Sequence, residues 1–371
     1  MKIMATGGGT GGHVYPALAA LDSLVALPHG GVTREDICWV GSHDGVERGI
    51  VQRSGYSYQV VSTGPLRGAN LFQALASLRL ILRGTKQSLA LLRRSRPAAV
   101  LATGGFVSVP LVLAAWLRRV PAMLYLPDME PGLAVKMLAR IATRVAVSFE
   151  PAAVYFGGKA VVTGYPVRQA LFEADHAEAR RQLGIEGDLP LVLVMGGSRG
   201  ARSINMALQG GLASLLTRAQ VLHVTGLLDY DAMLAARQAL PPALRPRYRV
   251  HDYLHTEMVA ALAAADLVVA RSGAATLGEF PAVGLPAILI PYPHAGQHQW
   301  LNAAYLADAG AALVLADDRL GEELLPMIER LLDDPSALAR LSAAARAKSM
   351  PQAAERIAAQ LLAVARGGRH G

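Results

Sequence analysis

The sequence contains a single cysteine, Cys38, among its 371 residues. One cysteine builds neither a disulfide framework nor a thiol-rich metal site, and it is typical of a protein from a reducing compartment. Aromatic residues are scarce at 5% and charged residues make up only 17%, whereas 52% of the residues are hydrophobic. This composition excludes disorder, and the length is sufficient to bury the cores of two domains.

Acidic residues are absent from one long stretch. Between Arg48 and Pro127 there is no Asp or Glu, against eleven Lys and Arg, and the whole chain carries a formal net charge of +8. Such an asymmetry indicates a negatively charged partner. No nucleic-acid-binding motif accompanies the basic residues, so we expect no nucleic-acid partner and favour an anionic membrane surface.

Long apolar runs are also lacking. The chain turns at Gly7, too early for the apolar region of a signal peptide. The longest uncharged stretch, residues 97–117, is interrupted by Gly104, Gly105 and Pro110, which predicts a strand, a loop and a helix. We therefore expect a peripheral protein at the cytoplasmic face of the cell membrane.

Glycine, in contrast, is concentrated in three turns. GGGTGGH at residues 7–13 and GGSRGARSIN at residues 196–205 each follow a short apolar strand and open a helix, and GGFVSVP at residues 104–110 does the same. The backbone N–H groups at a helix N-terminus form a site for phosphate groups. Two such turns half a chain apart predict two nucleotide-binding domains.

Apolar strands alternate with helical patterns along the whole chain. This alternation predicts an α/β fold with two doubly wound, Rossmann-like domains built on parallel sheets, and a cleft between them. We place the N-terminal domain at residues 1–165 and the C-terminal domain at residues 166–350. A final helix and tail at residues 351–371 can pack back on the N-terminal domain, and GYPVR at residues 164–168 is the expected hinge.

The first turn satisfies the pattern G-x-G-x-x-G, which alone suggests a dinucleotide site. A nicotinamide enzyme, however, needs an acid at the end of the second strand, where this chain has Gly41, Ser42 and His43, with Asp44 slightly late. His13 ends the same turn at a helix N-terminus, which favours the neutral imidazole that a general base requires. The alternative for His13 is a capping or packing role.

Two polar segments lie in the second half. Glu279, inside ARSGAATLGEFPAVGLP, is suited to accept hydrogen bonds from the two hydroxyls of a ribose, although a lone Glu is more often a surface acid. PYPHAGQHQWLNA at residues 291–303 carries amides and imidazoles for a sugar. His294 and His298 are four residues apart but have no third ligand, so we expect no metal site.

Residues 71–94 form a helical pattern with an apolar face edged by cations. Such a face lies in a lipid interface, or is the core-facing stripe of an ordinary surface helix. The acid-free surroundings favour membrane contact through Arg79, Arg83 and Lys86. The apolar positions are Leu75, Leu78, Leu82, Leu89 and Leu92.

Together the motifs resemble the MurG family of glycosyltransferases over nearly the whole chain. The segments that carry the resemblance are GGGTGGHVYPALA (7–19), GPLRG (64–68), GGFVSVP (104–110), GYPVR (164–168), GGSRGARSIN (196–205), RSGAATLGE (271–279), GLPAILIPYPHAGQHQWLNA (284–303) and AGAA (309–312).

The resemblance implies a GT-B fold, with the acceptor and the membrane at the first domain and UDP-N-acetylglucosamine (UDP-GlcNAc) mainly at the second. It implies an inverting transfer of N-acetylglucosamine, without metal or cofactor, to the C4 hydroxyl of the N-acetylmuramyl sugar (MurNAc) of lipid I. The product is lipid II, a precursor of peptidoglycan and so of cell-wall growth, cell shape and division.

The resemblance also assigns roles to individual residues. On the acceptor and diphosphate side it places Arg67, Gly104 and Gly105. The implied donor contacts are Thr10, Gly11, Gly12, Asp128, Arg168, Ser198, Leu254, Ala274, Ala275, Thr276, Leu277, Gly278, Glu279 and Gln299.

One segment departs from the family. Where the family shows His-Glu-Gln-Asn after its fifth strand, this chain has Tyr125, Leu126, Pro127 and Asp128. We expect His13 to be the catalytic base, with Asp128 and Glu130 as alternates. The alternatives left open are a related glycosyltransferase with another lipid acceptor, a catalytically weakened UDP-sugar-binding protein, and a nicotinamide oxidoreductase.

Overall fold

The computed structural model describes residues 1–8, 11–28, 30–64, 71–197, 200–294 and 298–367. The chain divides into two compact units. The first consists of Met1–Val167 together with Gln352–Gly371, and the second is Arg168–Pro351.

The described residues of the first unit form a seven-stranded parallel sheet in the order β3-β2-β1-β4-β5-β6-β7. The order reverses between β1 and β4, which is the switch point of a doubly wound sheet. The strands are β1 (Ile3–Thr6), β2 (Ile37–Gly41), β3 (Ser57–Val60), β4 (Ala99–Ala102), β5 (Ala122–Leu126), β6 (Arg144–Val147) and β7 (Ala160–Val162). The helices are α1 (Gly11–Ala26), α2 (Val46–Arg53), α3 (Leu71–Ser95), α4 (Ser108–Leu117), α5 (Leu133–Leu138), α6 (Glu150–Ala153) and α17 (Ala353–Gly367).

The second unit repeats this plan with a six-stranded parallel sheet, again among the residues described, in the order β10-β9-β8-β11-β12-β13. Its strands are β8 (Leu191–Met195), β9 (Gln220–Val224), β10 (Tyr248–His251), β11 (Leu267–Arg271), β12 (Ala287–Ile290) and β13 (Ala312–Val314). Its helices are α7 (Ala170–Glu173), α8 (His176–Gln182), α9 (Arg202–Gln209), α10 (Leu212–Leu215), α11 (Tyr230–Ala239), α12 (Met258–Ala264), α13 (Thr276–Val283), α14 (His298–Ala307), α15 (Leu320–Leu332) and α16 (Pro335–Ala347).

The strands are short and almost entirely apolar because helices cover both faces of each sheet. In β5, Met123 and Tyr125 belong to the core on one face, and Leu124 and Leu126 to the core on the other. The predicted alternation of apolar strands and helices is present in both units, so the prediction of two doubly wound α/β domains is confirmed. The cleft between the domains stays a prediction.

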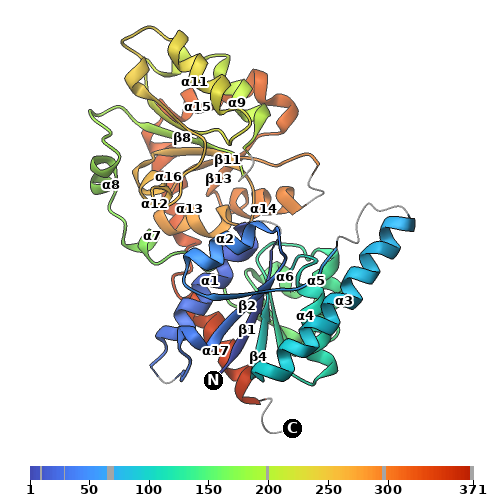
Figure 1. Cartoon of the computed structure of the whole chain (residues 1–371). Coiled ribbons are helices and arrows are strands. Elements are labelled where there is room, and N and C mark those ends of the chain that lie inside the picture. Colours follow the sequence, from blue (N-terminus) through green and yellow to red (C-terminus); the bar gives the residue numbers. More distant parts are fainter. Residues whose placement is uncertain (9–10, 29, 65–70, 198–199, 295–297, 368–371) are drawn as a thin grey trace. The chain divides into compact units, whose positions relative to one another are not determined.

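The last helix, α17, belongs to the first unit although it follows the second in the sequence. In Figure 1 this red helix lies beside the blue α1, against which it packs. Ile357, Ala358 and Leu361 are fully buried there. The chain therefore leaves the first unit, builds the second and returns.

Among the residues that the structure describes, no helix is both long and apolar enough to cross a membrane. The uncharged stretch at residues 97–117 consists of β4, a glycine turn and α4. The helix expected at residues 71–94 is present as α3.

Candidate active site at the carboxyl ends of the strands

The first and third glycine turns pack directly against each other. They follow β1 and β4, which are neighbours in the sheet, so both turns lie at the same edge. A Cβ on Gly7 would lie 1.9 Å from the hydroxyl oxygen of Thr103, and one on Gly105 would lie 2.7 Å from the carbonyl oxygen of Gly8. Only glycine permits so close an approach of two backbones.

His13 lies in the first turn of α1 and bridges these two loops. Its Nδ1 is 2.8 Å from the carbonyl oxygen of Thr103. A carbonyl oxygen only accepts, so Nδ1 carries the proton of the hydrogen bond, and Nε2 of the neutral ring is an acceptor. The ring edge also faces Gly104, because a Cβ there would lie 3.6 Å from Cε1 of His13. The structure thus holds the tautomer that a base acting through Nε2 needs.

Glu47, which was not among the predicted site residues, is a carboxylate with 1% of its surface exposed behind the first turn. It begins the first turn of α2 and accepts hydrogen bonds from the backbone amide of Ser42 at 3.1 Å and from the Ser42 hydroxyl at 2.7 Å. A Cβ on Gly8 would lie 2.8 Å from its Oε2. An acid at the second position of the helix after β2, just past Gly45, was the available signal.

The position of Glu47 argues against the alternative that the protein is a nicotinamide oxidoreductase. The end of β2, where such an enzyme carries its ribose-binding acid, is occupied by Ser42. The hydroxyl and amide of Ser42 both point to the buried Glu47 carboxylate. This carboxylate is built into the protein and is not presented to a ribose.

The segment that departs from the family places its first residue in the core. The Tyr125 hydroxyl lies 2.6 Å from that of Ser148, which itself donates to the carbonyl oxygen of Leu126. Burial, and to a smaller extent the charge of Asp128, raises the pKa of Tyr125 well above its ordinary value. Tyr125 therefore does not replace a cleft-facing histidine.

The two alternate bases differ in their surroundings. Asp128 is half-buried two residues beyond β5. Glu130 forms an ion pair with Lys136, whose Nζ is 3.0 Å from Oε1. The Glu130 carboxylate is thus engaged with α5, whereas His13 lies against the third glycine turn.

In the second unit, the second glycine turn joins β8 to α9. Gly200 has φ of +81°, and a Cβ there would lie 2.2 Å from the carbonyl oxygen of Thr225. The Gly200 amide donates to the carbonyl oxygen of Gly197 at 2.8 Å, which closes the turn. Glycine is needed at residue 200 both for the positive φ and for the close approach.

A buried polar network supports this turn. Asn205, on α9, donates from Nδ2 to the Thr225 carbonyl at 3.0 Å and to Asp229 at 2.9 Å. Its Oδ1 accepts from Nε2 of His223, whose Nδ1 is 2.8 Å from the Tyr248 hydroxyl. Burial lowers the pKa of His223 to about 3, so the ring stays neutral and the bond directions are fixed.

Glu279 lies in the first turn of α13, beyond the carboxyl end of β11. Burial raises the pKa of Glu279, and the positive charge of Arg168 partly offsets this. Thr276, three residues earlier, donates its hydroxyl hydrogen to the Gly273 carbonyl at 2.7 Å and so caps the turn that precedes the helix. The other residues predicted here (Ala274, Ala275, Leu277 and Gly278) belong to the same turn and helix.

Gln299 lies in the first turn of α14 and is hydrogen-bonded to the segment after β11. Its backbone carbonyl accepts from the Ser272 hydroxyl at 2.8 Å, and its side-chain Oε1 accepts from the Tyr292 amide at 2.9 Å. Asn302 donates to the Ser272 carbonyl at 3.0 Å. These bonds orient the Gln299 amide so that its Nε2 is the group that can donate to a sugar hydroxyl.

The predicted site residues divide between the two units. His13, Gly104, Gly105, Asp128 and Glu130 lie in the first, with Gly11 and Gly12 opening α1. The second contains Arg168, the buried Leu254 beyond β10, the α13 residues and Gln299. Thr10, Arg67 and Ser198 lie outside the described residues. Within the described ranges, no group of three or more His, Cys, Asp or Glu could hold a metal ion.

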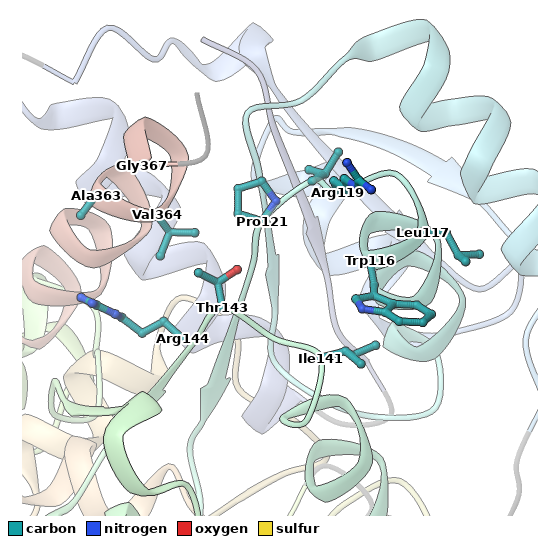
Figure 2. A pocket seen from close by; sticks show the side chains of 11 residues that line it. Trp116, Leu117, Arg119, Pro121, Ile141, Thr143, Arg144, Ala363, Val364 and Gly367 are labelled. Atoms are coloured by element: carbon teal, nitrogen blue, oxygen red, sulfur yellow. The ribbon is translucent and has the colours of Figure 1, made fainter. Parts of the chain in front are cut away.

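A cavity of about 890 Å³ lies at the opposite edge of the first sheet, where β5 and β6 begin. Figure 2 shows Trp116 and Arg119 on one side of it, and Arg144 and Val364 of α17 on the other. The glycine turns are at the carboxyl ends of the strands, so this cavity is not part of the candidate active site.

Comparison with known proteins identifies relatives over nearly the whole chain. The models of the N-terminal and C-terminal domains of glycosyltransferase family 28 match residues 3–147 and 191–357. Two proteins named UDP-N-acetylglucosamine--N-acetylmuramyl-(pentapeptide) pyrophosphoryl-undecaprenol N-acetylglucosamine transferase are similar to the chain. The protein from Roseiflexus sp. (strain RS-1) is 41% identical, over 96% of this chain and 94% of its own. The one from Halothermothrix orenii is 38% identical, over 95% and 96%. A crystal structure of MurG from Acinetobacter baumannii matches with a TM-score of 0.74 at 26% identity, over 97% of this chain and 99% of that one.

Proposed function

This chain belongs to glycosyltransferase family 28, and from this we infer that it transfers N-acetylglucosamine from UDP-GlcNAc to lipid I, undecaprenyl-pyrophosphoryl-MurNAc-pentapeptide, giving lipid II. The support is similarity to transferases of this name along nearly the full length of both chains. We further propose that the acceptor binds to the first unit and the donor mainly to the second, and that the transfer is inverting and independent of a metal ion.

The observation that carries the catalytic assignment is the hydrogen bond between His13 and the Thr103 carbonyl. It leaves Nε2 as the basic nitrogen, at the edge of the sheet where the first and third glycine turns meet. His13 then removes the proton from the C4 hydroxyl of MurNAc as that oxygen attacks the anomeric carbon of the donor. The bond from the anomeric carbon to UDP breaks, and the configuration at that carbon changes from α to β.

The departing UDP carries the charge that develops in this reaction. We propose that backbone N–H groups at the N-termini of α9 and α13, together with Arg168, stabilise the diphosphate. Glu279 accepts hydrogen bonds from the ribose hydroxyls, and Gln299 donates to the sugar. Leu254 contacts the uracil through its backbone.

The direct test is incubation of the protein with UDP-GlcNAc and lipid I in the presence of EDTA. We expect UDP and a lipid-linked disaccharide with a β linkage in equal amounts. An α-linked product contradicts inversion, and activity that EDTA abolishes contradicts metal independence. Turnover only with another lipid acceptor favours a related transferase, and donor binding without turnover favours a weakened UDP-sugar-binding protein.

We also propose that α3 attaches the first unit to an anionic membrane at its cytoplasmic face. Leu78 and Leu82 on this helix are exposed, together with Arg79, Arg83 and Lys86. Trp116 and Leu117 at the end of α4 are more than half exposed, and α4 packs against α3. Apolar side chains bordered by cations suit a surface of anionic lipids.

A further inference from the structure

A cluster of three polar side chains joins separate segments at the carboxyl edge of the second sheet. It consists of Ser203, Arg271 and Asp317, and we refer to it as the Arg271 cluster. Ser203 lies in the first turn of α9, Arg271 ends β11, and Asp317 follows β13. Ser203 and Asp317 are 114 residues apart in the sequence. The ligands of doubly wound sheets bind at this edge, so the cluster lies where a role in binding is expected.

The three side chains close a ring of hydrogen bonds. Arg271 donates from Nη1 to Oδ1 of Asp317 at 2.5 Å and from Nη2 to the Ser203 hydroxyl at 2.7 Å. The Ser203 hydroxyl donates in turn to the same Oδ1 at 2.8 Å. Since 10% of the Arg271 side chain and 22% of the Asp317 side chain are exposed, each charge depends on the other for compensation. Charge-assisted hydrogen bonds in such surroundings fix the orientation of the guanidinium group.

The guanidinium group also reaches the segment that orients Gln299. Nη1 of Arg271 is 3.4 Å from the carbonyl oxygen of Ile290, which ends β12, and the guanidinium carbon lies 5.2 Å from the centre of the Tyr292 ring. The Tyr292 amide donates to Oε1 of Gln299 at 2.9 Å. Ser272, which follows Arg271, donates its hydroxyl hydrogen to the backbone carbonyl of Gln299 at 2.8 Å. One arginine therefore connects the first turn of α9 with the segment that holds Gln299.

We propose that Asp317 is a positioning residue for the donor substrate and acts through Arg271. This rests on the proposed function, in which the N-terminus of α9 binds the diphosphate of UDP-GlcNAc and Gln299 binds its sugar. By holding Arg271 together with Ser203, Asp317 fixes these two subsites relative to each other, so that one donor molecule contacts both. Leu254, which is proposed to contact the uracil, lies beyond β10 on a segment outside the cluster.

The test measures binding of UMP and of UDP-GlcNAc by calorimetry, because both contain the uracil, the ribose and the first phosphate. Asp317→Asn removes the charge that holds Arg271 and should weaken UDP-GlcNAc binding at least tenfold. The affinity for UMP should change less than twofold, because UMP lacks the second phosphate and the sugar. Asp317→Glu keeps the charge and should restore UDP-GlcNAc binding to within threefold of wild type.

Asp266→Asn is the matched control. Asp266 precedes β11 at its opposite end, where it accepts from Nη1 of Arg180 at 3.4 Å and from the Leu191 amide at 2.7 Å. This variant also breaks an arginine–aspartate pair of the second unit, but at the amino edge of the sheet. It should lower the melting temperature and change the affinity for UDP-GlcNAc less than twofold.

Two results would show that Asp317 only stabilises the fold, and each overturns the proposal. One is equal weakening of UDP-GlcNAc binding by Asp317→Asn and Asp266→Asn. The other is equal weakening of UMP and UDP-GlcNAc binding by Asp317→Asn. If Asp317→Asn does not fold, Ser203→Ala removes one hydroxyl group of the cluster and should weaken the binding of UDP-GlcNAc but not of UMP. Unchanged UDP-GlcNAc binding in Ser203→Ala then overturns the proposal.

Kinetics with lipid I separates this inference from the proposed function. Asp317→Asn should raise the KM for UDP-GlcNAc at least tenfold and leave the KM for lipid I unchanged. A wild-type protein that shows the expected binding pattern but transfers no sugar to lipid I refutes the proposed function and retains the role of Asp317. A wild-type protein that forms lipid II while Asp317→Asn binds UDP-GlcNAc normally supports the proposed function and refutes that role.

Discussion

At the scale of single residues, the first unit places a histidine, a buried carboxylate and four glycines around two adjoining turns. Thr103, in the third turn, accepts from Nδ1 of His13, and Glu47 supports Gly8 from behind. The role proposed for His13 depends on these contacts, because a general base must be held within hydrogen-bond distance of the hydroxyl group from which it removes a proton.

His13→Ala should lower kcat by about 10² to 10⁴, the usual contribution of a general base. The KM for UDP-GlcNAc should change little, because the proposed donor contacts lie mainly in the second unit. Steady-state kinetics with lipid I measures both. If kcat stays near wild type, His13 has a structural role, and Asp128→Asn and Glu130→Gln become the deciding variants.

Glu47→Gln should lower kcat by about 10- to 100-fold, because a displaced turn misplaces the reacting groups. The amide oxygen still accepts from the Ser42 amide and hydroxyl, but it is neutral, so both bonds to it are weaker, and an NH2 group replaces the second carboxylate oxygen beside Gly8. Asp22→Asn is the matched control, since this carboxylate accepts from Tyr56 at 2.6 Å but lies nine residues beyond His13 on α1. It should lower the melting temperature without a comparable loss of kcat. Equal losses of kcat in the two variants would show that Glu47 acts only through stability.

Glu279→Gln should raise the KM for UDP-GlcNAc about tenfold, because a charged hydrogen-bond acceptor for the ribose is lost. Burial raises the pKa of Glu279, so protonation begins at a higher pH than for an ordinary glutamate. The wild-type KM should therefore rise as the pH falls through this raised pKa, and the variant's KM should lack that rise.

The same raised pKa predicts the sign of a stability effect. Between the unfolded and folded pKa values the native state binds more protons, so the contribution of Glu279 to stability decreases as the pH rises through this window. Glu279→Gln should thus melt at a higher temperature than wild type at neutral pH. If Glu279→Gln melts at a lower temperature than wild type and its KM for UDP-GlcNAc is unchanged, Glu279 neither destabilises the fold at neutral pH nor binds the donor.

At the scale of elements, α3 is part core and part surface along its length. Leu92 and Ile81 are buried in the first unit, whereas Leu78 and Leu82 are exposed beside cations. The predicted apolar stripe is thus partly core and partly surface, which the periodicity alone did not separate. Leu75 is among the residues whose side chains are not described.

Arg79→Gln/Arg83→Gln/Lys86→Gln should weaken binding to vesicles with anionic lipids at least tenfold, since each cation near such a surface contributes about 1 kcal/mol. Sedimentation with vesicles at low and high salt measures the effect, and added salt should reduce the difference. The control Arg181→Gln/Arg319→Gln/Arg340→Gln removes the same charge from the second unit. If the control variant binds the vesicles as weakly as the α3 variant, the loss of binding reflects the net charge of the protein and not the position of these cations on α3.

At the scale of the whole molecule, the first unit is completed by a helix that follows the second unit in the sequence. α17 buries Ile357, Leu361 and Ala365 against the core that includes α1. The stability of the first unit therefore depends on residues more than 180 positions beyond the point where its main part ends.

Leu361→Ala should destabilise the first unit by about 2–5 kcal/mol, the usual cost of removing a buried leucine. Leu362→Ala, at the adjacent and only partly buried position, should cost clearly less. Calorimetric unfolding of both variants measures this, with UDP added to mark the transition of the second unit. Equal destabilisation by the two variants, or loss of UDP binding in Leu361→Ala, would contradict the assignment of α17 to the first unit.

The sequence by itself determined the two α/β domains, the strands and the glycine turns. These follow from local pattern, because a buried parallel strand is a short apolar run and a close backbone approach requires glycine. Only the tertiary structure decided which nitrogen of His13 is basic, that Tyr125 points into the core, and that Glu47 supports the first turn. These outcomes depend on contacts between distant segments, such as the 90 residues between His13 and Thr103, which no local pattern contains.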